Sequence, residues 1–130
     1  MEKILTALQE RKKTAPRLAK NSKLFKTIIH AIQEKKGEGI VVLDLRKINE
    51  AVADYFILCD GRSNIQVKAI ADNIRDEVEK DCDEKPYHIE NGDKWTLVDF
   101  VNVVVHIFQH EQRQFYSLES LWAAAERTEY

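Results

Sequence analysis

The sequence is poor in cysteine and has no long apolar run. Its only cysteines, Cys59 and Cys82, lie too far apart in the chain to form a zinc or redox motif. The longest apolar stretches, 40–43 and 103–105, are the size of strand segments, far below the roughly 20 residues that span a bilayer. No apolar signal-peptide core follows Met1. We therefore expect a cytoplasmic protein without a membrane anchor, whose two cysteines are ordinary core residues.

The chain length and composition fit one folded domain. The sequence has 130 residues, of which 44% are hydrophobic and 32% are charged. This balance is typical of a globular domain with a real core, and it argues against a disordered chain.

The charges are unevenly distributed along the chain. Residues 1–26 hold eight lysines and arginines against two glutamates, whereas the remaining residues carry 12 basic and 20 acidic side chains, a net charge of −8. An acidic body should repel naked nucleic acid and attract a basic protein surface. The basic segment either contacts phosphate groups or simply forms a solvated helix.

The domain boundary is predicted between Pro16 and Asn21. Residues 1–20 form a basic N-terminal arm, either helical or disordered, in which Ile4, Leu5 and Leu8 share one helical face and Pro16 ends the pattern. Residues 21–130 form the main domain. Its periodicity predicts helices at 24–36, 63–82 and after 111, and strands at 40–45, 55–59, 86–90, 95–100 and 103–108.

This order of elements predicts a single α/β domain. We expect a mixed sheet of about five strands with flanking helices, a class that includes the nucleotidyltransferase-like folds. Ser22 or Asn21 should cap the first helix of the domain, and Ser63 with Gln66 forms a capping-box pattern for the second.

No catalytic, metal or cofactor site is predicted. The turn Gly61-Arg62-Ser63 precedes a helix, but a phosphate-binding loop needs more glycines and a lysine, so a plain turn with a helix cap is the preferred interpretation. His106 and His110 are four apart, but they straddle the end of a strand, where their side chains should diverge. A nucleotide-handling enzyme stays open as the alternative, on the weak ground of fold class.

The strand at 95–100 carries large apolar groups on both faces. Alternation places Trp95, Leu97 and Asp99 on one face, with Thr96, Val98 and Phe100 on the other. One face must meet the core. The Trp95 face either lies under the last helix or forms an interface, and spacing alone does not distinguish these cases.

Seven ordered motifs between Val42 and Trp122 resemble the ribosomal silencing factor family, also called Iojap-like. They are V-L-D-L-R (42–46), A-D-Y-F-I-L-C (53–59), G-R-S-N (61–64), V-K-A-I-A-D (67–72), W-T-L-V-D-F (95–100), V-V-V-H-I-F (103–108) and R-Q-F-Y-S-L-E-S-L-W (113–122). The combination, in order over about 80 residues, is specific, although each motif alone is weak. The first 20 residues lie outside the resemblance.

The resemblance implies a non-catalytic translational repressor. Members of the family bind large-subunit ribosomal protein fourteen, block the joining of the small and large subunits, and tend to form homodimers. Matched positions imply a partner-binding surface that includes Trp95, Leu97, Asp99, His106, Arg113, Tyr116 and Glu119. The basic arm could add a peripheral contact with ribosomal RNA.

The sequence departs from the family pattern after Phe100. The family often has Gly-Asp there, whereas this chain has Val101-Asn102. Because a β-branched residue is unfavourable at positive φ, we expect a turn other than a two-residue turn with positive φ at Val101.

Overall fold

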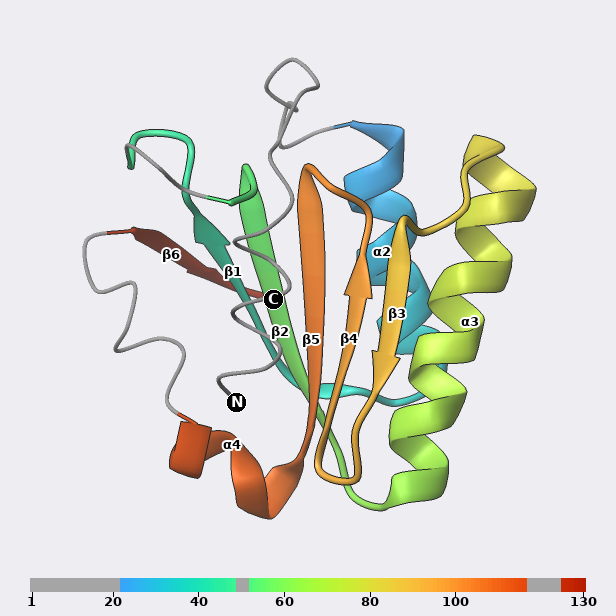
Figure 1. Cartoon of the computed structure of the whole chain (residues 1–130), viewed down its shortest axis with the longest axis vertical. Coiled ribbons are helices and arrows are strands. Elements are labelled where there is room, and N and C mark those ends of the chain that lie inside the picture. Colours follow the sequence, from blue (N-terminus) through green and yellow to red (C-terminus); the bar gives the residue numbers. More distant parts are fainter. Residues whose placement is uncertain (1–21, 49–51, 117–124) are drawn as a thin grey trace.

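Six strands form one mixed sheet in the computed structural model of the protein, which describes residues 22–48, 52–116 and 125–130. The strand order is β3-β4-β5-β2-β1-β6; β2 and β5 run parallel, and every other neighbouring pair is antiparallel (Figure 1). The elements are α2 (Lys23–Glu34), β1 (Glu38–Asp44), β2 (Tyr55–Gly61), α3 (Asn64–Cys82), β3 (His88–Asn91), β4 (Trp95–Asp99), β5 (Val103–Gln109), α4 (His110–Tyr116) and β6 (Glu126–Glu129). The predicted single α/β domain with a mixed sheet is confirmed.

Helices α2 and α3 pack side by side on the first face of the sheet (Figure 1). Their apolar stripes meet strand residues such as Tyr55, Ile57, Val98 and Val105 in one continuous core. Both predicted cysteines are free, with Cys59 buried in this core and Cys82 partly buried beside it. None of the helices in the described part of the chain has the length and apolar character needed to cross a membrane.

Both long helices begin at the predicted serine caps. Ser22 Oγ accepts a hydrogen bond from Phe25 N at 3.2 Å, and Ser63 Oγ accepts one from Gln66 N at 3.1 Å. The Gln66 side chain does not complete the capping box at Ser63; it accepts from Arg62 N and donates to the carbonyls of Lys35 and Lys36. It therefore ties the start of α3 to the end of α2.

The C-terminal region differs from the helical prediction. The described part of the helix after residue 109 is the short α4, and a sixth strand, β6, pairs antiparallel with β1. Three of its four residues are charged, so β6 has no hydrophobic pattern to reveal it. Backbone pairing to β1 determines its position, and this kind of interaction leaves little trace in a sequence.

The expectation for the turn between β4 and β5 is wrong. Val101 has a φ of +74°, and Phe100 N donates to Val103 O around a two-residue loop. Asn102 N donates to Phe100 O at 2.9 Å, the pattern of a γ-turn centred on Val101. Asp99 Oδ1 accepts from Val101 N at 2.7 Å, and Asn102 O accepts from the backbone of the neighbouring strand β2. These contacts outweigh the poor conformational preference of valine.

Candidate functional site

The second face of the sheet carries a cluster of apolar and aromatic side chains around one imidazole. Its members project from four neighbouring strands, and none is more than 3% exposed. Neither α2 nor α3 contributes a residue to this cluster. The second face is formed by Val41, Leu43, Phe56, Leu58, Trp95, Leu97, Val104, His106 and Phe108.

Trp95 and His106 form a buried polar pair at the centre of the second face. Trp95 Nε1 donates to His106 Nδ1 at 3.1 Å, and the imidazole lies edge-on to the Phe56 ring, with 4.5 Å between the ring centroids. Burial lowers the pKa of His106 to about 3, so the ring is neutral at physiological pH. Because Nδ1 accepts a hydrogen bond, the hydrogen of the neutral ring is on Nε2.

The Nε2–H group of His106 is a buried donor without an acceptor among the described residues. A buried unsatisfied donor costs about 1–3 kcal/mol. The second face therefore presents one specific hydrogen-bonding group within an otherwise apolar surface.

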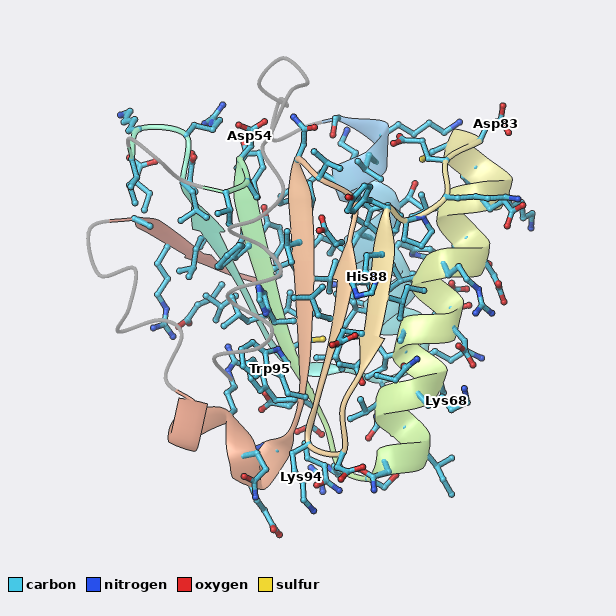
Figure 2. The ribbon with its side chains drawn as sticks, viewed as in Figure 1. Asp54, Lys68, Asp83, His88, Lys94 and Trp95 are labelled. Carbon is cyan, nitrogen blue, oxygen red and sulfur yellow. The ribbon has the colours of Figure 1, made fainter. Side chains whose placement is uncertain are left out.

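Asp99 shares the second face with Trp95 and Leu97 but acts locally. Its residue is 2% exposed, and its carboxylate holds the Val101 turn. At the same end of the sheet, Asn102 Nδ2 donates to Asp54 Oδ2 at 2.9 Å, which fixes this turn against the start of β2. Figure 2 shows Asp54 at this end of the strands and Lys94 at the opposite end.

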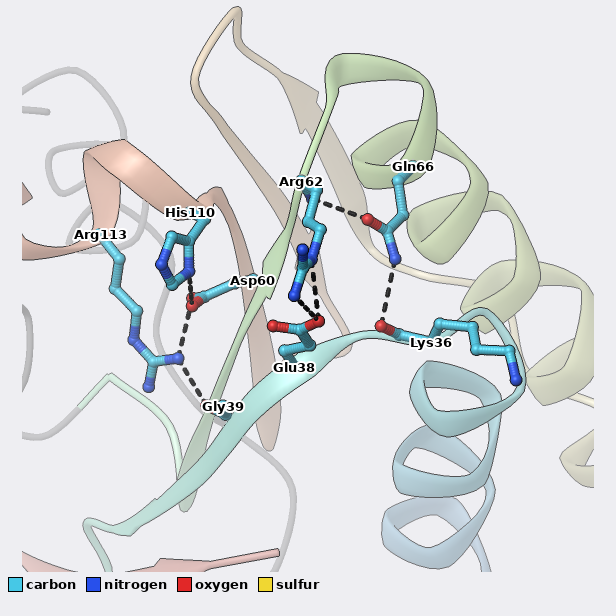
Figure 3. Close-up of polar contacts among 8 residues, drawn as sticks. All are labelled: Lys36, Glu38, Gly39, Asp60, Arg62, Gln66, His110 and Arg113. Carbon is cyan, nitrogen blue, oxygen red and sulfur yellow. Dashed lines mark hydrogen bonds and ion pairs between the residues drawn. The ribbon is translucent and has the colours of Figure 1, made fainter.

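A second polar group lies where the parallel strands β2 and β5 end, and we call it the Asp60 cluster: Asp60, His110 and Arg113 (Figure 3). The Asp60 carboxylate receives Arg113 Nη1 at 2.8 Å and His110 Nδ1 at 3.0 Å. Arg113 Nη1 also donates to the carbonyl of Gly39. The side chains of Asp60 and Arg113 are only 8% and 12% exposed, so this ion pair is well shielded and joins α4 to β1 and β2.

Gly39 is required at this junction for two reasons. Its φ of +58° is strained for other residues, and a Cβ atom there would lie 2.7 Å from Arg113 Nη1. The nearby Arg62 pairs with Glu38 at 2.9 Å (Figure 3). The Gly61-Arg62-Ser63 turn is therefore a turn with a helix cap, as the preferred sequence interpretation had it.

The structure brings four of the predicted site residues together and separates a fifth. Trp95, Leu97, Asp99 and His106 are neighbours on β4 and β5, all at 2% exposure or less. Arg113 lies on α4 and binds Asp60. Tyr116 is the last residue of α4, with a side chain outside what the structure describes, and Glu119 lies outside the described residues.

Sequence reasoning missed the contribution of Gly39, Asp60 and His110. The available signal was weak: an aspartate at the end of a buried strand, followed by glycine. Nothing in the local pattern connects it with an arginine 53 positions later. The topology of the sheet makes that connection.

The chain matches the family model described as "Ribosomal silencing factor during starvation" over residues 18–130. It is 39% identical to the ribosomal silencing factor RsfS of Bacillus subtilis, with 78% of this chain and 86% of the relative covered. It is 36% identical to the chloroplastic protein Iojap of Zea mays, over 76% of this chain and 43% of that longer protein. A crystal structure of a protein from Chromobacterium violaceum has the same fold, with a TM-score of 0.72 and 31% identity over 77% of this chain and 83% of that one. The chain belongs to the family of ribosomal silencing factors.

Proposed function

We propose that the protein binds the large ribosomal subunit through large-subunit ribosomal protein fourteen and sterically blocks the joining of the small subunit. Translation is thereby repressed without any catalytic step. The observation that carries this proposal is membership of a family whose relatives are named ribosomal silencing factors.

The second face supplies the chemistry for a protein partner. Trp95, Leu97 and His106 combine large apolar surface with one hydrogen-bond donor, a composition typical of interface anchors. The net charge of −8 beyond residue 26 favours a basic partner, such as a ribosomal protein. Asp99 contributes to this surface, and α4 contributes Arg113, Tyr116 and the following Glu119.

Arg113 has a positioning role in this proposal. Its guanidinium binds Asp60 and Gly39, so it holds α4 against the sheet, and α4 presents the residues that follow it to the partner. Replacing Arg113 should therefore weaken binding through displacement of α4.

The proposal has three further parts. The protein acts in the cytoplasm, its basic arm makes a peripheral contact with ribosomal RNA, and it forms a homodimer. Because β3 and β6 are the edge strands of the sheet, a second copy can associate by pairing along one of them. Light scattering at micromolar concentration tests the dimer, and a mass near the 15.1 kDa monomer at every concentration contradicts it.

Charge reversal at the rim of the second face tests the docking surface. Glu90 faces this side because it pairs with Leu97 across β3 and β4, and its side chain is 31% exposed. Glu90→Lys should weaken co-sedimentation with purified large subunits by about tenfold or more, since a carboxylate facing a basic partner becomes a like charge. Glu79→Lys, the same charge change on α3, is the matched control and should bind as the parent does. Equal binding by all three proteins would reject this surface.

A further inference from the structure

The second face is dry although both long helices lie on the opposite side of the sheet. His106, Phe56 and Phe108 are 0% exposed, and the cluster around them contains no residue of α2 or α3. An exposed surface with this many aromatic and aliphatic side chains would be a strong association site. A partner cannot reach it unless whatever covers it moves away.

We propose that residues 1–17, the segment that precedes the family match, cover the second face in the free protein and compete with the docking partner for it. The inference rests on the proposed function for the identity of the competitor, but the cover itself does not depend on that identity. The segment has the right apolar pattern, because Ile4, Leu5 and Leu8 share one helical side.

The length of the segment matches the face. Seventeen residues in a helix extend about 25 Å, and the seven residues of β5 extend about 23 Å. The chain between α4 and β6, by contrast, has only the eight residues 117–124 before Ala125 and must connect the end of one element to the start of the other. The N-terminal segment is the longer stretch available to lie along the strands.

The charges of the segment and the face are complementary. Residues 1–17 carry five basic and two acidic side chains. The second face has carboxylates along its rim, at Glu90 on β3 and at Glu129 on β6, which lies opposite Val41 of β1. Lysines and arginines beside an apolar stripe can reach these rim carboxylates while the stripe packs on the strands.

The unsatisfied His106 donor gives the partner an advantage over the cover. In the free protein Nε2–H is buried without an acceptor. A partner that places a carbonyl or carboxylate oxygen against Nε2 removes this penalty, whereas the cover leaves it in place. The face is thus closed in the free protein and better satisfied in the complex, as expected for an exchangeable internal contact.

Two adjacent substitutions in the full chain test the cover. Leu5→Asp places a charge in the apolar stripe, and Thr6→Asp makes the same charge change about 100° away on the helical wheel. Both are made in a Trp122→Phe background, so that Trp95 is the only tryptophan. Acrylamide quenching of its fluorescence should rise severalfold in Leu5→Asp and stay at the parent value in Thr6→Asp.

Binding to purified large subunits is measured on the same proteins. If the cover is closed nine-tenths of the time, Leu5→Asp should bind about tenfold more tightly than the parent. Increased quenching without subunit binding by any of the proteins would defeat the proposed function and leave the cover standing. Unchanged quenching in Leu5→Asp, or equal increases in both variants, would overturn the cover.

A cross-linking measurement decides the case if Leu5→Asp fails to fold. A benzoylphenylalanine at position 8 of the full chain should form adducts with peptides of β2, β4 or β5 in the same molecule. Adducts confined to α2 and α3, adducts only between two copies, or no adduct at all would overturn the proposal.

Discussion

Acidification should destabilise the protein through His106 by an amount that follows from its burial. The imidazole is fully buried and neutral, and its pKa in the folded protein is about 3, against 6.5 for an exposed histidine. Below pH 6.5 the unfolded chain therefore binds a proton that the folded protein does not bind. Protonation favours the unfolded state, so the free energy of unfolding falls as the pH decreases from 6.5 towards 3.

The size of the loss can be worked out for a convenient pair of conditions. At pH 7.5 the unfolded histidine is mostly neutral and the contribution is near zero. At pH 5 it is almost fully protonated, and the linkage relation gives a loss of about 2 kcal/mol. Other groups titrate over the same interval, so the comparison must isolate His106.

His106→Gln isolates this contribution because the amide can still accept a hydrogen bond from Trp95 but does not titrate. Urea unfolding followed by circular dichroism should show a parent protein that is more stable than the variant at pH 7.5. This advantage should shrink by about 2 kcal/mol at pH 5. His30→Gln, at a side chain that is 68% exposed, is the matched control and should follow the parent at both pH values. An advantage over His106→Gln that stays constant between the two pH values would refute the buried neutral histidine.

Three further outcomes follow from the same structure. Val101→Gly should unfold with a free energy about 1 kcal/mol higher than Val101→Ala in urea titrations, because glycine tolerates the φ of +74° without strain; equal stabilities would argue against the γ-turn. Gly39→Ala should lower stability by about 1–3 kcal/mol, and by clearly less in an Arg113→Ala background, since the added Cβ would lie 2.7 Å from Arg113 Nη1; additive effects would contradict the junction. Burial raises the pKa of the Cys59 thiol, so a thiol reagent should modify only Cys82 in the folded protein, and rapid modification of both would contradict the packing of β2.

Burial patterns explain how far the sequence alone predicts the fold. The stripes of α2 and α3 and the alternation along β4 are all visible, because each element must hide one side from water. The pairing of Trp95, Leu97 and His106 on one surface was accordingly predictable. Serine caps such as Ser22 and Ser63 are local and were predicted as well.

The features that escaped prediction depend on contacts between distant parts of the chain. The charged strand β6 is held by the backbone of β1, and the γ-turn at Val101 is held by Asp99 and by β2. The Asp60 cluster joins residues 39, 60, 110 and 113, which only the completed sheet brings together. Whether the Trp95 face is open or closed also depends on what covers it, and the pattern of the strand itself carries no information on this.

Subunit joining is the most direct test of the proposed function. Purified small and large subunits are mixed at a magnesium concentration that permits association, with and without an excess of the protein, and separated on a sucrose gradient. The proposal predicts that the joined-ribosome peak is depleted and that the protein migrates with the large subunit. An unchanged gradient profile, with the protein remaining at the top, would contradict it.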